Sequence, residues 1–369
     1  MGKELRGGYT TGACAAAGVK ACLLFLAGEF CSRVELTALD GTPLIIPVKE
    51  IIPTEGGARA EVVKFSGDDP DITNGVSVFT EIVKLPEGSG ISFSSGEGIG
   101  HVTKPGLSLS VGEPAINPGP RKLIRRVAEE LLGEKAGLAV KISIPAGKEL
   151  AKQTLNPVLG IEGGISVIGT TGVLRPMSEE GFKNALVPQI DVAKAAGFSS
   201  QVFVPGKIGE NIALTYGLPR EAIVQTSNFI GFMLEKAEER GVESVLLFGH
   251  PGKLAKVAAG VFYTHNRIGD ARMETMAAYG AAEGLSSAGV RRILASVTTE
   301  ESLAVLEEEG IAERVCSVLA QRASLRAKRY LFGKVNVGTV MVTLKGKLLG
   351  VDDEGERIGE ALHWNPKRA

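Results

Sequence analysis

The chain has 369 residues, a formal net charge of −1 and 22% charged residues. This length allows two or three domains with sizeable cores, and the balanced charge excludes a global attraction to nucleic acid or acidic membranes. No uncharged apolar run reaches membrane-spanning length, and no secretory apolar core follows the N-terminus. No zinc-ligand spacing links the cysteines, and a chain of this size needs no disulfide framework. We therefore expect a protein of the reducing cytoplasm, without a membrane or nucleic-acid partner.

A helix is predicted over residues 13–27, which are rich in Ala and Gly. Thr10 and Thr11 are natural N-cap residues for it, and its small side chains are typical of a tightly packed buried helix. The loop Thr10-Thr11-Gly12 is a candidate substrate-binding loop, because two hydroxyls lie beside free helix amides. Cys14 lies near the helix N-terminus, which lowers a thiol pKa. No histidine is close in sequence, so we interpret Cys14 as a packing residue.

Residues 33–112 are rich in predicted strands, among them 34–39, 44–46 and 60–65. The loop 67–75 carries three aspartates in four positions, a composition that suggests a metal site. Because the calcium-loop spacing is absent, a capped turn is the favoured interpretation. The loop 96–106 is glycine-rich, but it lacks the following helix of a dinucleotide-binding motif.

A basic helix is predicted over residues 121–132, and a strand over 139–144. Four cations of this helix recur at spacings of three and four and share one face: Arg121, Lys122, Arg125 and Arg126. They form either a solvated face paired with nearby glutamates or a carboxylate clamp. The clamp hypothesis makes Arg121 and Arg125 candidate substrate-binding residues, because arginine binds carboxylates in a bidentate manner.

The pattern changes near residue 150, where hairpin-like strands give way to alternating strands and helices. We predict an α+β domain over residues 1–150 and an α/β domain over residues 151–369, with a mostly parallel sheet. The predicted elements of the second domain are strands at 201–204, 222–226 and 244–248, helices at 229–240, 270–288 and 299–332, and a hairpin at 337–351.

Two stretches of the second domain combine a buried strand, a glycine turn and a helix start. One is the strand 165–168 with its turn, and the other is the strand 245–248 with a turn before a helix from Lys253. Open α/β sheets bind anionic or nucleotide-like ligands at such places, where helix amides are free. The candidate cofactor-binding residues are Gly169, Thr170, Thr171, Gly172, Gly249, Gly252 and Lys253. The alternative is a buried strand, a turn and a solvated helix, since glycine loops often match by chance.

Several short motifs occur together in one order along the chain: residues 8–17, 69–75, 96–100, 115–118, 155–166, 169–173, 227–231 and 249–256. On these motifs the chain resembles the CbiD family, the cobalt-precorrin-5B (C1)-methyltransferases of anaerobic cobalamin synthesis. The resemblance extends from residue 8 to about 275. Asn266 departs from it, since serine is expected at that position.

The resemblance implies methyl transfer from S-adenosylmethionine to C-1 of a ring-contracted tetrapyrrole. Such a displacement depends on alignment and exclusion of water. The cobalt belongs to the substrate, so the resemblance requires no metal site of the protein. The macrocycle carries acetate and propionate groups, so Arg and Lys are expected in a cleft between the domains. If a proton must leave, the candidate bases are His250, His265 and Asp270.

Two other functions are compatible with parts of the sequence. One is a phosphate- or nucleotide-binding transferase that uses residues 249–253, although Leu254 stands where the Walker motif requires Ser or Thr. The other is a non-catalytic corrinoid-binding protein, against which the polar residues between 265 and 274 argue. The sequence leaves the oligomeric state open.

Overall fold

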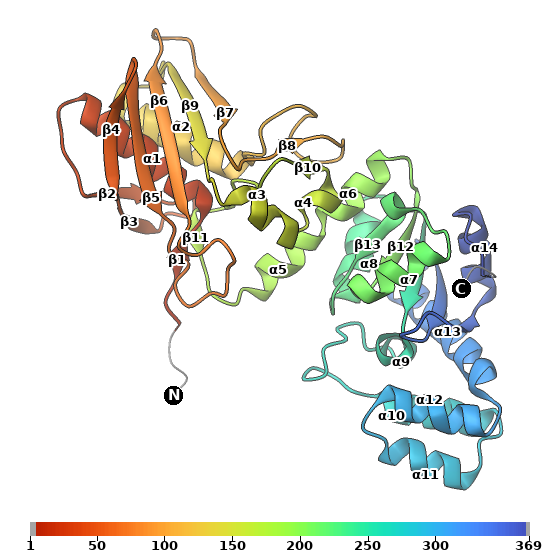
Figure 1. Ribbon diagram of the computed structural model, residues 1–369. Coiled ribbons are helices and arrows are strands. Elements are labelled where there is room, and N and C mark those ends of the chain that lie inside the picture. Colours follow the sequence, from red (N-terminus) through yellow and green to blue (C-terminus); the bar gives the residue numbers. More distant parts are fainter. Residues whose placement is uncertain (1–4, 367–369) are drawn as a thin grey trace. The chain divides into compact units, whose positions relative to one another are not determined.

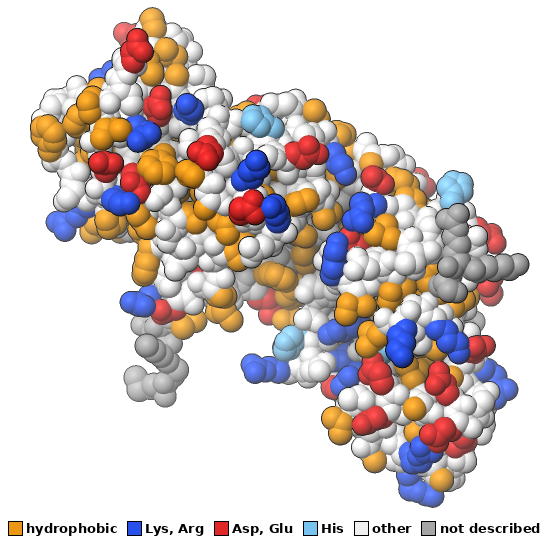
Figure 2. Space-filling model, viewed as in Figure 1, with side chains coloured by type: hydrophobic (Ala, Val, Ile, Leu, Met, Phe, Trp, Pro, Cys, Tyr) orange, Lys and Arg blue, Asp and Glu red, His pale blue; other side chains and the backbone are white. Residues whose placement is uncertain are grey.

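The computed structural model describes residues 5–366. It divides into two compact units, Met1–Glu179 and Glu180–Ala369, called unit 1 and unit 2 below (Figure 1). Both contain helices and sheets, so the prediction of a mixed α/β chain is confirmed. Figure 2 shows basic and acidic side chains interspersed over the visible surface, as expected from a net charge of −1.

Unit 1 contains a five-stranded sheet with the strand order β4-β5-β6-β9-β7. Neighbouring strands are antiparallel except β7 and β9, which are parallel. β2 and β3 form a separate hairpin. The strands of this unit are β1 (Gly8–Tyr9), β2 (Arg33–Thr37), β3 (Pro43–Pro47), β4 (Glu50–Thr54), β5 (Gly57–Val63), β6 (Ser77–Lys84), β7 (Ile91–Ser95), β8 (His101–Val102), β9 (Leu138–Ser143), β10 (Ile161–Glu162) and β11 (Val173–Leu174).

The two long helices of unit 1, α1 (Thr11–Leu26) and α2 (Pro118–Leu132), lie behind the sheet in Figure 1 and confirm the predicted helices. α1 is buried over most of its length because its small residues let the sheet come close. A Cβ atom on Gly18 would lie 2.6 Å from the Thr80 hydroxyl oxygen, and that hydroxyl donates to the Ala15 carbonyl at 3.3 Å. The short helices α3 (Gly147–Leu150) and α4 (Asn156–Leu159), with a 3-10 turn at Ala151–Gln153, follow β9.

The boundary between the compact units lies later than the predicted position near residue 150. The segment that follows residue 150 returns to unit 1, because β10 pairs with β8 and β11 pairs with β1. The prediction of a strand at 165–168 is wrong. Residues there form only isolated bridges, Ile165 to Ile99 and Val167 to Ile116.

Unit 2 contains a sheet with the strand order β13-β12-β14-β15-β16. The strands β13, β12, β14 and β15 are parallel to one another, whereas β16 is antiparallel to β15. The strands are β12 (Ser200–Val204), β13 (Ile223–Gln225), β14 (Ser244–Gly249), β15 (Asn336–Val342) and β16 (Leu348–Val351). The first strand of this unit therefore lies between its second and third strands, so the strand order reverses there. The predicted terminal hairpin is confirmed, but its first strand is an interior strand of the sheet.

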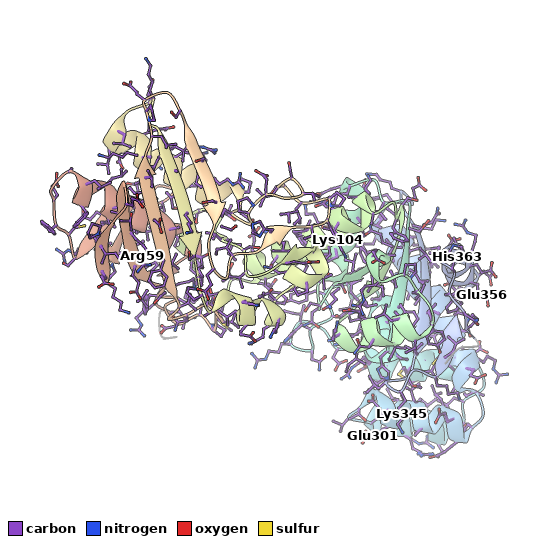
Figure 3. The ribbon with its side chains drawn as sticks, turned by 45° about the horizontal axis from the view of Figure 1, so that its top comes forward. Arg59, Lys104, Glu301, Lys345, Glu356 and His363 are labelled. Atoms are coloured by element: carbon purple, nitrogen blue, oxygen red, sulfur yellow. The ribbon has the colours of Figure 1, made fainter. Side chains whose placement is uncertain are left out.

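The helices of unit 2 are α5 (Glu179–Leu186), α6 (Pro188–Ala195), α7 (Lys207–Thr215), α8 (Ile230–Glu239), α9 (Pro251–Ala258), α10 (Arg272–Ala282), α11 (Ser287–Ala295), α12 (Thr299–Glu308), α13 (Ala312–Tyr330) and α14 (Asp353–Ala361), with a 3-10 turn at Arg220–Ala222. The helix predicted over 299–332 is two helices, which Gly310 separates with a φ of 71°. Thr298 and Glu301, the latter labelled in Figure 3, form a capping box at the start of α12. None of the helices in the described part of the chain is long and apolar enough to cross a membrane.

Candidate functional site

The two Thr-Thr-Gly loops meet within unit 1. Gly12 donates its N–H to the Ile168 carbonyl at 3.0 Å, and Thr10 donates its N–H to the Gly172 carbonyl at 2.9 Å. The Thr11 hydroxyl accepts the N–H of Ile168 at 2.9 Å. The loop predicted to bind the substrate and one of the two loops predicted to bind the cofactor thus form a single structure, called the threonine junction. Because the junction lies in unit 1, residues 169–172 do not belong to the sheet of unit 2.

Most polar groups of the threonine junction are paired within the protein. The Thr10 hydroxyl accepts the N–H of Ala13 at 3.2 Å and caps α1, and Thr10 and Thr11 are buried. Gly169 has a φ of 138°, and a Cβ atom there would lie 2.2 Å from the Thr10 hydroxyl oxygen. Thr171 accepts the Leu39 N–H at its carbonyl and the Val173 N–H at its hydroxyl, whereas Thr170 is exposed. The junction therefore holds backbone segments together and offers little to a ligand.

The environment of Cys14 agrees with its interpretation as a packing residue. Cys14 is buried in α1, and burial raises the pKa of its thiol to about 12. The effect of burial therefore exceeds that of the helix N-terminus, which acts in the opposite direction.

The two candidate arginines of the basic helix α2 differ in their exposure and in their contacts. Arg121 donates to Glu113 at 3.0 Å and to the Ile116 carbonyl at 2.7 Å, and its side chain is 15% exposed. Arg125 is exposed and lies over the Phe93 ring at 5.3 Å. Within residues 5–366 no carboxylate pairs with Arg125, so this guanidinium is the one available to a ligand.

The carboxyl ends of β12, β13 and β14 lie at one edge of the unit 2 sheet, because these strands are parallel. The strand order reverses between β12 and β14, and open α/β sheets bind ligands at such a topological switch point. Three short segments lie at these strand ends, 205–206, 227–228 and 249–250, and we call them the switch-point edge. A Cβ atom on Gly206 would have no neighbour within 4 Å, which indicates open space there.

The helix after β14 begins at Pro251, two residues earlier than predicted, and His250 closes its N-terminus. The His250 Nδ1 accepts the Gly252 N–H at 3.1 Å, and its carbonyl accepts the N–H groups of Lys253 and Leu254. A Cβ atom on Gly252 would also lie 3.2 Å from the Thr299 hydroxyl oxygen. The amides predicted to contact a ligand are therefore paired internally, so the Lys253 side chain is the polar group that this turn offers.

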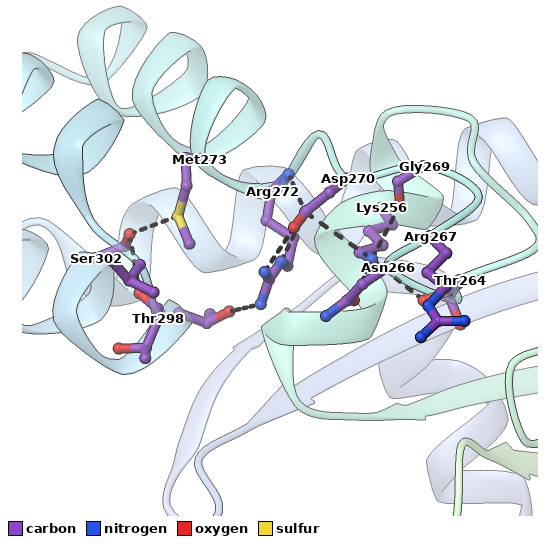
Figure 4. A network of polar contacts seen from close by, with 12 residues as sticks. Lys256, Thr264, Asn266, Arg267, Gly269, Asp270, Arg272, Met273, Thr298 and Ser302 are labelled. Carbon is purple, nitrogen blue, oxygen red and sulfur yellow. Dashed lines mark hydrogen bonds and ion pairs between the residues drawn. The ribbon is translucent and has the colours of Figure 1, made fainter.

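The side chains of two lysines on α9 hold the loop 264–270, and Figure 4 shows the contacts of one of them, Lys256. Lys253 donates from Nζ to the Asn228 Oδ1 at 2.7 Å and to the Thr264 carbonyl at 3.2 Å. Lys256 is fully buried and donates to three oxygens of the loop: Thr264 O at 3.2 Å, Asn266 Oδ1 at 2.7 Å and Gly269 O at 3.0 Å. Burial lowers the pKa of Lys256, although nearby Asp270 opposes the shift.

Two of the candidate bases, His265 and Asp270, belong to this loop and the third, His250, caps α9, but their contacts do not favour proton abstraction. Asp270 accepts two hydrogen bonds from Arg272 at 2.7 Å each, and these lower the pKa of Asp270 to about 2. His265 accepts the N–H of Arg267 at Nδ1, as His250 accepts that of Gly252. When neutral, each imidazole therefore carries its proton on Nε2 and acts there as a donor.

The surroundings of His250 act on its pKa in opposite directions. Burial lowers the pKa of His250, against the opposing effect of Glu300, whose Oε1 lies 3.4 Å from the Nε2 of His250.

No group of three or more His, Cys, Asp or Glu side chains that could hold a metal ion occurs within residues 5–366. In the acidic loop 67–75, Asp71 accepts the N–H and hydroxyl of Thr73 and pairs with Lys64, as the capped-turn interpretation predicts.

Several residues at the switch-point edge and around the helix α9 were not identified from the sequence. Asn228 belongs to a recognised motif and follows a predicted strand, which was a usable signal. Lys256 lies one helical turn after Lys253, but its burial depends on the loop 264–270. Gly206 follows the strand predicted over 201–204, which was also a usable signal, whereas Glu300 gave none, because only the tertiary fold brings it to His250.

Comparison with known proteins identifies the family. The sequence model of the CbiD family matches residues 1–176, and that described as CbiD, C-terminal domain, matches residues 263–353. The cobalt-precorrin-5B C(1)-methyltransferase of Moorella thermoacetica is 47% identical over 360 residues, which cover 97% of this chain and 98% of that protein. The protein of the same name from Methanocaldococcus jannaschii is 45% identical over 350 residues, covering 94% and 96%. The crystal structure of a cobalamin biosynthesis protein (cbiD) from Archaeoglobus fulgidus is 29% identical and covers 73% of this chain and 84% of that chain, with a TM-score of 0.37.

Proposed function

Because the chain belongs to the CbiD family, we propose that it transfers a methyl group to C-1 of cobalt-precorrin-5B and forms cobalt-precorrin-6A in cobalamin synthesis. The observation that carries this proposal is the identity of 47% and 45% to two methyltransferases of that name over nearly their full length. The methyl donor implied by the reaction is S-adenosylmethionine, and the cobalt enters as part of the tetrapyrrole substrate.

The donor supplies an electrophilic methyl group on a sulfonium. The task of the protein is to align the two reactants and keep water out, since orientation accounts for much of the acceleration of such a displacement. This agrees with the contacts of His250 and His265, whose Nε2 atoms act as hydrogen-bond donors and not as bases in the neutral form. The Nε2 atom of His265 is thus suited to orient a polar group of a ligand without taking a proton, whereas that of His250 faces Glu300.

We place the donor at the switch-point edge of unit 2, beside Gly206 and Gly249. Two features support this position: the reversal of strand order between β12 and β14, and the open space at Gly206. The threonine junction is left out of the donor site, because its polar groups are already paired.

Gly206→Val tests the donor position. The residue has an extended backbone with a φ of 174°, which valine adopts without strain, and the added side chain fills the space assigned to the donor. Binding of S-adenosylhomocysteine, measured by calorimetry, is expected to weaken at least about tenfold, equivalent to 1.4 kcal/mol. Gly249→Val is a poorer test, because its Cβ would lie 3.0 Å from Pro205.

The control for this test is folding. Valine is a poorer N-cap than glycine and costs α7 about 1 kcal/mol. Trp364 is the only tryptophan, and it packs against Tyr216 in the core of unit 2, so its fluorescence reports unfolding of that unit. Wild-type affinity in a folded Gly206→Val variant would place the donor elsewhere.

In unit 1, we assign a substrate carboxylate to Arg125. A charge-assisted hydrogen bond contributes about 1.5–3 kcal/mol, so Arg125→Ala is expected to weaken tetrapyrrole binding roughly tenfold or more. Lys122→Ala, an exposed cation of the same helix, is the matched control. Arg121→Ala is expected instead to destabilise unit 1, because Arg121 holds the segment 113–116. Equal tetrapyrrole affinity of Arg125→Ala and the control would refute this assignment.

A further inference from the structure

Four rings form a row along one side of the loop 264–270. They are Phe182 on α5, Phe229, Tyr263 and His265, and successive ring centroids lie 5.9, 5.0 and 6.3 Å apart. Aromatic residues make up only 5% of the chain, and the Phe182 side chain at one end is 55% exposed. An exposed phenylalanine that continues such a row offers apolar area to a ligand.

The aromatic row runs beside a lysine that pairs only with neutral groups. The two oxygens that hold the Lys253 ammonium belong to Asn228 and Thr264, the sequence neighbours of Phe229 and Tyr263. The Lys253 side chain is partly exposed, and within residues 5–366 no carboxylate lies within ion-pair distance of it. The row and the ammonium are therefore positioned by the same two backbone segments.

Positive side chains outnumber the carboxylate of Asp270 in and around the loop 264–270, although one of them, Lys256, is buried. Lys256 and Arg272 share the carboxylate of Asp270, and Arg267 is exposed on the same loop (Figure 4). Arg272 takes both oxygens of Asp270, so little negative charge remains for Lys253. A ligand with several carboxylates complements this surface, whereas S-adenosylmethionine carries two positive groups and a single carboxylate.

We propose that the tetrapyrrole substrate lies against the aromatic row in unit 2, with Lys253 and Arg267 binding its side-chain carboxylates. This inference rests on the proposed function, and it assigns to the substrate the lysine that the sequence predicted to bind the cofactor. Asn228 belongs to the switch-point edge and also holds Lys253. A macrocycle on the aromatic row therefore lies beside the proposed donor site, as direct methyl transfer requires.

The tilt of the rings suits this class of ligand. Successive rings are inclined by 55°, 37° and 60°, so they do not form one flat plane, and Phe229 lies buried within the row. A reduced, methylated macrocycle with tetrahedral ring carbons is puckered. Such a ligand makes apolar contacts with inclined rings more readily than a flat purine does.

The probe is cobyrinic acid, a cobalt corrin with free side-chain carboxyl groups, and its binding is measured by calorimetry beside that of S-adenosylhomocysteine. Lys253→Met and Phe182→Ala are each expected to weaken cobyrinic acid about tenfold and to change S-adenosylhomocysteine less than twofold. Arg267→Gln, at an exposed position, tests the carboxylate contact with little effect on the fold. Arg292→Gln, which removes an exposed cation of α11, and Phe332→Ala, at a ring that is 89% exposed, are the matched controls.

A second corrin separates charge from shape. Cobinamide carries amides in place of the carboxylates, so Lys253→Met and Arg267→Gln are expected to leave its affinity unchanged, while Phe182→Ala still weakens it. A lysine effect that persists with cobinamide would overturn the carboxylate assignment.

The remaining outcomes distinguish this inference from the proposed function. If the variants weaken S-adenosylhomocysteine and not cobyrinic acid, the surface belongs to the donor and the inference is wrong, while the methyltransferase proposal stands. The inference also fails if the folded variants bind cobyrinic acid as the wild type does, or if the wild type binds only S-adenosylhomocysteine. Failure of the wild type to bind either probe or to transfer a methyl group would contradict the proposed function itself.

Discussion

Replacement of Lys256 by methionine tests whether one buried ammonium holds the loop 264–270 in place. Methionine has a similar length and no charge, so the change removes three hydrogen bonds, the 3.9 Å ion pair with Asp270 and little volume. The Thr264 carbonyl keeps its bond from Lys253, and the exposed Asn266 amide regains water. The half-buried Gly269 carbonyl is the acceptor that loses its partner.

The expected loss of stability follows from these differences. One poorly solvated carbonyl left without a donor costs about 1–3 kcal/mol. Removal of the ammonium also removes its desolvation penalty, which offsets part of the lost charge-assisted bonds. We expect Lys256→Met to lower the free energy of unfolding of unit 2 by about 2 kcal/mol.

Two measurements check this prediction. Urea unfolding followed by Trp364 fluorescence gives the change in stability. Limited trypsin digestion gives the state of the loop, because release of the loop exposes the bond after Arg267 to faster cleavage. Lys334→Met is the matched control, since that lysine is a 60% exposed partner of Glu238 and is expected to change stability by less than about 1 kcal/mol. Wild-type stability together with unchanged cleavage after Arg267 would refute the role of Lys256.

Three further predictions concern other parts of the fold. Burial lowers the folded-state pKa of His250, so the contribution of this residue to stability is present above about pH 6.5 and is lost as the pH falls. His250→Asn keeps an N-cap group and is expected to flatten this part of the curve of stability against pH. An unchanged slope would contradict this role of His250. Because burial raises the pKa of Cys14 to about 12, iodoacetamide at pH 8 is expected to leave Cys14 unmodified in the native protein and to modify it in urea, and rapid native labelling on peptide mass spectra would count against its packing role. Gly169→Ala is expected to destabilise unit 1 by about 2 kcal/mol or more, because its Cβ would meet the Thr10 hydroxyl at a left-handed φ; a thermal melting curve equal to that of the wild type would show that the threonine junction tolerates the change.

The hydrophobic pattern of the sequence correctly predicted elements that have a single buried face or are buried throughout. The helix predicted over 13–27 is α1, and the strand predicted over 244–248 is β14, whose apolar run is fully buried. The strand predicted over 165–168 failed for a physical reason. Ile165 and Val167 are buried within unit 1, but each makes only a single bridge, to Ile99 and to Ile116, and local composition does not distinguish such a segment from a sheet strand.

The candidate site shows the same limit. The sequence identified Lys253, His265 and Asp270 as polar residues near a strand end, and the structure places them around the loop 264–270. The sequence did not show which groups these side chains contact. The helix amides predicted to bind a ligand are taken by His250, and Asp270 is engaged by Arg272.

The sequence by itself determined the family, the order of most helices and strands, and the residues with chemical potential, because these depend on local composition and on short motifs. The tertiary structure decided which of those residues remain available to a ligand. Thr11 and Ile168 are separated by 157 residues yet exchange hydrogen bonds, so a loop that the sequence predicted to bind a ligand holds the fold together. A polar group serves a ligand only if the fold leaves it unpaired, and pairing between distant segments is set by packing that local sequence does not encode.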